Sequence, residues 1–312
     1  MADGWGDIPT AIPTELILPR QYAPANQLSR AGAYLRGANL STENLDRVDF
    51  TRADLSGANL ALSSLIDAQM DNVNLSGAIL THANLTAASL RRATLLGTVL
   101  RAAKLDQATL SHANLAGANL TEADLCNVNL ADADLSYAIL RRASLVSANL
   151  SRTCLTKVNA NGAELYGIHG NLTQLSRSQL QGCDLRQANL TQANITRANL
   201  AQSNLNQANL SGTNATEALL KQVNLAWVTI SYSNFASANL QRVIMTNAKL
   251  VETDFSGADL QYATLDNSVF QQCRLNNISW HQVSVRGTHF CHPLGLSKYE
   301  KAWLRSQGAK IN

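Results

Sequence analysis

The sequence is poor in aromatic residues, charge and proline, and each shortage narrows the choice of structure. Aromatic side chains make up 5% of the 312 residues and charged ones 15%. A core of small aliphatic units is therefore expected, and a disordered, highly charged chain is excluded. All five prolines lie outside residues 33–292. Because proline lacks a backbone donor and interrupts strand pairing, this distribution favours an unbroken hydrogen-bonded array.

Cysteine pairs and long apolar runs are also missing. The five cysteines are an odd number without Cys-x-x-Cys spacing, which indicates neither a disulfide framework nor a zinc ribbon. No apolar run approaches the ~18 residues of a membrane span, and the start of the chain lacks the basic and apolar stretches of a secretory signal. We therefore expect a cytoplasmic protein without a membrane span.

A five-residue period organises almost the whole chain. From Leu35 to Phe290, 38 of the 52 residues at every fifth position are Leu, and only Ala160, Gly170 and Ala215 are small. Ala is the commonest residue two positions earlier, and Asn or Asp commonly lies between, as in Ala58-Asn59-Leu60. Neither the 3.6-residue helical period nor the two-residue strand period matches this repeat. The chain must therefore turn every five residues.

Four such units would close a square coil of 20 residues. The first and third residues of each unit would point inward, and the next two would form a corner. Coils stacked at about 4.8 Å would then give a rod of about 13 coils with a Leu and Ala core.

The repeated Ala-Asn/Asp-Leu-x-x unit resembles the pentapeptide-repeat family over residues 33–292. The resemblance implies an all-β solenoid, the right-handed quadrilateral parallel β-helix. The sequence is similar to cyanobacterial-type members of the family. The family includes regulators that act through protein contacts and dimers that protect DNA gyrase. Enzymes are not characteristic of the family.

Segments at both ends depart from the repeat and are expected to cap it. Residues 1–32 leave the five-residue register, and residues 293–312 contain a Ser297-x-x-Glu300 capping box that predicts a helix ending near Gly308. Tyr299, Ala302 and Trp303 would share the helix face that lies over the last coil. The predicted domains are thus 1–32, 33–292 and 293–312.

Residues 20 apart should stack into columns, so surface patches can be inferred from the numbering. One outward column contains Ile79, Val99, Asn119 and Ile139, where Asn or Asp would be routine. Exposed apolar residues flanked by Tyr and Arg have the composition of a protein-binding patch. The candidate partner-binding residues, including the flanking corners, are Ile79, Leu96, Val99, Arg101, Tyr137, Ile139, Arg141 and Arg142.

A corner column begins with Gly37, Gly57, Gly77, Gly97 and Gly117, which indicates a tight turn with positive φ at that corner. The same column later carries Lys157, Arg177 and Arg197, a candidate anion-facing ladder. A solvated surface is the simpler interpretation of these cations. The formal net charge of +3 and the scatter of the other basic residues disfavour nucleic acid as a partner.

Other features predict little chemistry. The segment 159–171 is the least regular, and a bend or bulge is expected there. His289-Phe290-Cys291-His292 matches no established metal-site spacing, and no catalytic motif occurs, so we expect no metal, no cofactor and no catalytic residues. A filled rod should also offer no concave pocket for a small-molecule substrate.

The sequence thus favours a non-catalytic scaffold or regulator that binds a partner protein along one face. The alternative is a DNA mimic that interacts with DNA gyrase, which the slightly basic charge disfavours. The identity of the partner and the choice between monomer and dimer stay open.

Overall fold

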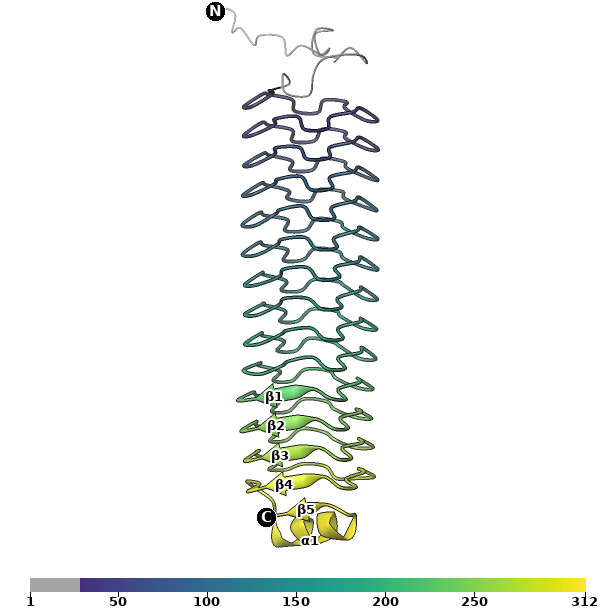
Figure 1. The fold of residues 1–312 in the computed structure, drawn as a ribbon, viewed down its shortest axis with the longest axis vertical. Coiled ribbons are helices and arrows are strands. Elements are labelled where there is room, and N and C mark those ends of the chain that lie inside the picture. Colours follow the sequence, from purple (N-terminus) through teal and green to yellow (C-terminus); the bar gives the residue numbers. More distant parts are fainter. Residues whose placement is uncertain (1–28) are drawn as a thin grey trace, which may run out of the picture.

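Each five-residue unit forms one short extended segment followed by a two-residue corner, and the coils stack into a straight rod (Figure 1). The computed structural model describes residues 29–312. Parallel bridges join residues 20 apart along the rod, from Ser29↔Asp49 to Arg274↔Leu294. The predicted 20-residue coil and the right-handed quadrilateral β-helix are confirmed.

The repeat satisfies all five backbone N–H groups of a unit. In the unit from Asp54 to Ala58, the Asp54, Leu55 and Gly57 N–H groups donate to carbonyls of neighbouring coils at 2.7–2.9 Å. The Ala58 N–H closes the turn on the Leu55 carbonyl at 3.0 Å. The fifth donor, on Ser56, is bound by the Asp54 carboxylate at 3.0 Å. Asn or Asp recurs in the middle of the unit because its side chain accepts a hydrogen bond from the one N–H group that no backbone carbonyl binds.

Positive φ occurs at all four corners, which differs from the expectation based on one glycine column. The second corner residue has φ near +60°, as in Arg52 (59°), Glu122 (61°) and Trp227 (61°), and most such residues are not glycine. The closing bond across each corner requires this conformation at the third position of the turn. The glycines from Gly37 to Gly117 therefore occupy an ordinary corner with a residue that adopts it without strain.

The interior is a continuous column of buried aliphatic side chains. From Leu45 to Phe290 the fifth-position residues are buried, and Ala lines the column beside them. Buried hydroxyls replace Ala at some units and donate to a carbonyl of the preceding coil, as Thr98 does to Leu75 at 2.9 Å. Near the C-terminal end Phe235 stacks on Phe255 with ring centroids 5.4 Å apart.

The C-terminal end is closed by a sheet edge and a helix. Strands β1 (Thr229–Ser231), β2 (Lys249–Val251), β3 (Val269–Gln271), β4 (His289–Cys291) and β5 (Lys310–Ile311) form a parallel sheet in chain order. Helix α1 (Lys298–Ser306) lies across the end of the rod (Figure 1) and starts with the predicted Ser297–Glu300 capping box.

The orientation of α1 contradicts the predicted packing face. Leu304 is fully buried, whereas Tyr299 is 89% exposed and Ala302 and Trp303 are also exposed. Leu304 lies on another side of the helix from Tyr299, Ala302 and Trp303, and β5 pairs with β4 immediately after the helix. With this short connection, the Leu304 side points inward and the aromatic stripe stays outside.

The predicted bend or bulge at 159–171 is wrong. Bridges continue through Asn159↔Gln179 and His169↔Asn189 without a change of register. The hydrogen bonds between coils join backbone groups, so they persist where a core Leu is replaced by Ala or Gly. At Gly170 the Leu190 side chain occupies the space, since a Cβ there would lie 3.0 Å from Leu190 Cδ2. Around Ala160, where the repeat usually has Leu, the missing side-chain volume leaves a small cavity lined by aliphatic side chains.

The N-terminal limit of the coil pattern can be compared with the predicted domain boundary at residue 32. Residues 1–28, most of the predicted N-terminal cap, lie outside the described part of the chain. The coil pattern is already present at Ser29 and at Gly32. The boundaries at 32 and 292 stay predictions.

Candidate binding face

The apolar column predicted from the numbering exists as a physical column. Ile79 pairs with Val99, Val99 with Asn119, and Asn119 with Ile139 in successive coils. Ile79 is 43% exposed and Ile139 36% exposed. Val99 is partly buried, and Asn119 lies between it and Ile139, so the column presents apolar surface at three of its four positions.

These apolar residues replace the side chain that the repeat uses to bind its fifth N–H. Asn119, in the same column, accepts from the Thr121 N–H at 3.1 Å. Ile79, Val99 and Ile139 have no side-chain acceptor, so the N–H groups two residues later, on Thr81, Arg101 and Arg141, are left to solvent or to a binding partner. Each replacement gives up a hydrogen bond with a net value of about 1 kcal/mol.

The corner that follows this column is basic and internally linked. Arg101 and Arg142 lie 3.7 and 4.0 Å from opposite oxygens of the Glu122 carboxylate. Arg141 is exposed beside them. One carboxylate among three guanidinium groups leaves this corner with positive charge.

The corner that precedes the column is apolar and aromatic. Leu96 is 43% exposed and Tyr137 is 60% exposed. The Lys157 ammonium donates to the Tyr137 hydroxyl at 2.9 Å and lies 4.9 Å from the centre of its ring. Lys157 therefore holds the phenol ring of Tyr137 through two contacts.

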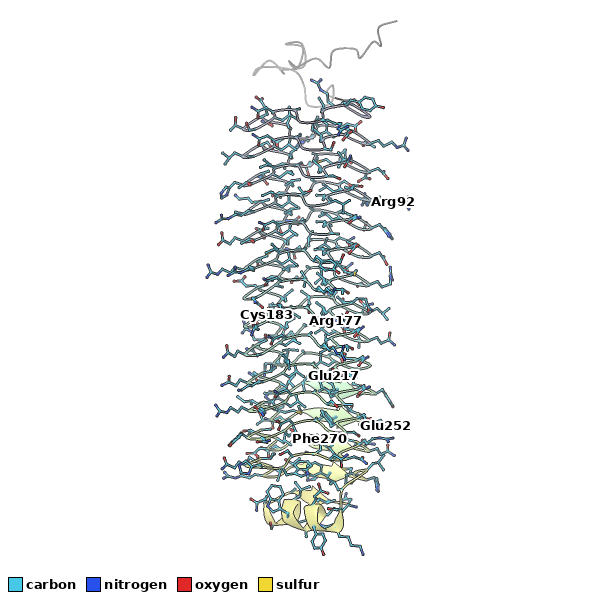
Figure 2. All side chains as sticks on the ribbon, turned by 180° about the vertical axis from the view of Figure 1, so that it is seen from behind. Arg92, Arg177, Cys183, Glu217, Glu252 and Phe270 are labelled. Carbon is cyan, nitrogen blue, oxygen red and sulfur yellow. The ribbon has the colours of Figure 1, made fainter. Side chains whose placement is uncertain are left out.

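The second predicted set, Lys157, Arg177 and Arg197, does not form three equivalent cations. Lys157 contacts Tyr137, and Arg197 forms a two-pronged bond with Glu217 at 2.8 and 3.2 Å. The Arg197 guanidinium holds the pKa of the Glu217 carboxyl below its usual value. Within residues 29–312, Arg177 forms no ion pair, and it lies in the same column as Glu217 (Figure 2).

Several features were missed at the level of sequence. In three units Ser replaces Asn, and an Asp on the corner of the preceding coil binds the leftover N–H, as Asp46 does for Ile66 at 3.0 Å. Two open surface grooves also occur, contrary to the expected lack of concavity. One groove is lined by Gly162, Gly182 and Glu164, and the other by residues that include Tyr232 and Glu252. The sequence signal for the first groove was the pair of glycines at corners 20 residues apart, which lack side chains to fill the surface.

The described residues hold little reactive chemistry. Within residues 29–312 no group of three or more His, Cys, Asp or Glu side chains gathers as a metal site. Burial raises the pKa of the Cys183 thiol to about 12 and that of Cys273 to about 11. Both thiols are therefore protonated and weakly nucleophilic at neutral pH.

A family model for pentapeptide repeats matches eight copies in stretches that extend from residue 31 to residue 277. The chain is a member of the pentapeptide-repeat family. No curated protein matches it. No helix within residues 29–312 is long and apolar enough to cross a bilayer.

Solved pentapeptide-repeat structures resemble parts of this member of the family. HetL, involved in heterocyst differentiation regulation in the cyanobacterium Nostoc sp. strain PCC 7120, is 31% identical. The match covers 70% of this chain and 87% of HetL, with a TM-score of 0.37.

Two further structures are more distant in sequence. A trypsin-treated variant of QnrB1, a plasmid-mediated fluoroquinolone resistance protein, is 15% identical over 62% of this chain and 87% of its own, with a TM-score of 0.38. Rfr23 from the cyanobacterium Cyanothece 51142 is 19% identical over 39% of this chain and 91% of its own, with a TM-score of 0.21. At these TM-scores none of the three superposes closely on the rod.

Proposed function

We propose that this rod is a non-catalytic scaffold or regulator that binds a partner protein through the face of Ile79, Val99 and Ile139. The observation that supports it is the replacement of Asn or Asp by an apolar residue at three positions of one column, where Ile79 and Ile139 are exposed and Val99 is partly buried. Each replacement forfeits a hydrogen bond that the repeat makes elsewhere. A gain outside the folding of the rod, such as a buried contact with a partner, accounts for keeping them.

The surroundings of the column indicate the chemistry of the partner. The apolar centre is bordered by Leu96 and Tyr137 on one corner and by Arg101, Arg141 and Arg142 on the other. Tyr and Arg are the residues that most often anchor protein interfaces. With Glu122 as the one nearby carboxylate, the complementary surface would be an apolar patch with an acidic rim.

The alternative function, a DNA mimic that interacts with DNA gyrase, is not supported by the basic corner of this face. The formal charge of +3 is opposite to that of a DNA mimic. A supercoiling assay with gyrase and a quinolone tests the alternative directly. A cytoplasmic location stays a prediction.

The binding face is tested with a triple variant, Ile79→Asn/Val99→Asn/Ile139→Asn. Asn restores the side-chain acceptor at each position, so the variant should fold at least as stably as the native rod. Affinity capture from the source cells, followed by mass spectrometry, should lose one reproducible partner.

A matched control is available in the same column. Leu219 lies four coils beyond Ile139 and is 44% exposed, as Ile79 is 43% exposed. Leu219→Asn makes the same chemical change outside the proposed face and should leave capture unchanged. Equal capture by the folded triple variant and by the native protein would remove the face from consideration.

A further inference from the structure

The net positive charge of the protein is concentrated at the C-terminal tip of the rod. Five of its 25 basic residues and one of its 22 acidic residues lie after Ser284. This last segment therefore carries a formal charge of +4, and the rest of the chain −1. The basic residues are Arg286, Lys298, Lys301, Arg305 and Lys310.

Glu300, the one acidic residue of this segment, and Asp266, the last acidic residue before it, are already engaged in local bonds. The Glu300 carboxylate accepts from the Ser297 N–H at 2.8 Å and from its hydroxyl at 2.7 Å. The Asp266 carboxylate accepts from the Ser284 hydroxyl at 2.6 Å and from the Arg286 N–H at 3.0 Å. Both carboxylates are turned to backbone donors, and no ion pair joins either one to a cation within residues 29–312.

Helix α1 presents an aromatic stripe away from the rod at this same end. Tyr299 is 89% exposed and Trp303, one turn later, is 36% exposed, while Leu304 is fully buried and anchors the helix. Lys298 and Arg305 are exposed beside this stripe. Solvent-facing tyrosine and tryptophan flanked by cations are typical of helices that lie in the interface of a bilayer.

We propose that the C-terminal tip docks on an anionic lipid bilayer, with Tyr299 and Trp303 at the level of the headgroups and the cations against the lipid phosphates. Helix α1 lies at the end of the rod with no other element beyond it, so its outer side protrudes there (Figure 1). A deformable bilayer can accept a protruding aromatic stripe, whereas a protein partner would need a matching groove. Lys298 and Arg305 supply the charge complementarity that selects anionic lipid.

The proposal is independent of the partner-binding face and is compatible with it. Because coils stack at about 4.8 Å, Ile139 lies roughly 35 Å along the rod from β4. A rod that stands on its tip would hold the proposed face clear of the lipid surface.

Vesicle co-sedimentation with the full chain tests the proposal. The probe is vesicles of phosphatidylcholine mixed with phosphatidylglycerol, compared with vesicles of phosphatidylcholine alone. We expect binding to the anionic vesicles that weakens as salt rises, because a surface potential is screened within a Debye length. Equal binding to both vesicles, or no binding to either, would overturn the proposal.

Two variants assign any binding to the tip. Tyr299→Ser/Trp303→Ser removes the aromatic stripe without touching Leu304, and we expect it to abolish most of the binding. Lys298→Gln/Arg305→Gln should lower the partition coefficient roughly 25-fold, since each cation near an anionic surface contributes about fivefold. Thermal unfolding checks that both variants fold.

Matched control variants change the same residue types on the shaft. Tyr232→Ser removes a tyrosine that is 68% exposed, and Arg177→Gln/Lys249→Gln removes two exposed cations. Both should bind vesicles as the native protein does. If the shaft variants lose as much binding as the tip variants, general charge attraction is responsible and the proposal is wrong.

Polyglutamate beads separate lipid from an acidic protein surface. Capture on these beads should depend on the cations and not on Tyr299 and Trp303. Capture that falls equally in the aromatic variant would assign the tip to an acidic protein and overturn the bilayer proposal.

Discussion

At the residue scale, one polar side chain per unit completes the hydrogen bonding of the backbone. Four of the five N–H groups bind carbonyls, and the fifth depends on the Asn or Asp beside it. The cost of losing that side chain should follow the burial of the donor it serves. Ala226 is a sharp case, because it is only 8% exposed and its N–H donates to Asn224 Oδ1 at 3.0 Å.

We predict that Asn224→Ala lowers the free energy of unfolding by about 1–3 kcal/mol, since the buried Ala226 N–H loses its acceptor. Asn114→Ala, whose Ala116 donor is half-buried and open to water, should cost less, about 0.5–1.5 kcal/mol. Denaturant unfolding measures both. Asn224→Asp retains the acceptor and serves as the control. Equal costs at the two sites would contradict the dependence on the burial of the donor.

Much of this residue-level order was predictable from sequence, because an unbroken period fixes which residues stack. The columns of Ile79, Val99 and Ile139 follow from numbering alone. The spacing of 20 residues between Arg197 and Glu217 also predicts their ion pair, so the numbering of this column contained the signal that its cations are not equivalent. Positive φ at every corner was hidden, because Arg, Gln and His adopt it there alongside Gly.

At the element scale, the C-terminal cap is attached through few residues. Helix α1 buries Leu304, and β5 adds two residues to the sheet beside β4. The sequence predicted the helix and its capping box from Ser297 and Glu300. It could not predict which side faces the rod, because three apolar residues share the aromatic stripe, whereas Leu304 is alone on the side that is buried.

We expect Leu304→Ala to release the cap while the shaft stays folded, because each coil of a solenoid is stabilised mainly by its neighbours. Loss of this buried side chain should cost about 2–5 kcal/mol locally. Hydrogen exchange followed by mass spectrometry should show faster exchange in α1 and β5 and unchanged protection around residues 79–142. Trp303→Ala, at the exposed stripe, is the matched control. Uniform loss of protection along the rod would contradict this local effect.

At the scale of the whole molecule, several carboxyl groups have lowered pKa values, so the free energy of unfolding depends on pH in the acid range. A guanidinium bonded to the carboxyl lowers the pKa of Asp132, Asp184 and Glu217. The Thr51 backbone N–H, as the largest cause, lowers that of Asp49. Such groups stabilise the folded state above their unfolded pKa, and the contribution is lost as the pH falls through the folded pKa.

We therefore predict that the free energy of unfolding is nearly constant from about pH 7 to pH 5 and falls below about pH 4. Urea unfolding at a series of pH values measures this dependence. Arg152→Gln, which removes the partner of Asp132, should flatten the acid limb. A rod that gains stability on acidification below pH 4 would contradict the sign of these shifts.

We propose that a partner protein binds to the apolar column of Ile79, Val99 and Ile139. Site-specific photo-cross-linking in the source cells tests this contact, with the cross-linker at Val99 or, as control, at Leu219 in the same column. One discrete adduct is expected from position 99 and none from position 219, and the adduct should disappear when Ile79 and Ile139 are changed to Asn. No adduct at position 99, or the same adduct at both positions, would contradict this proposal.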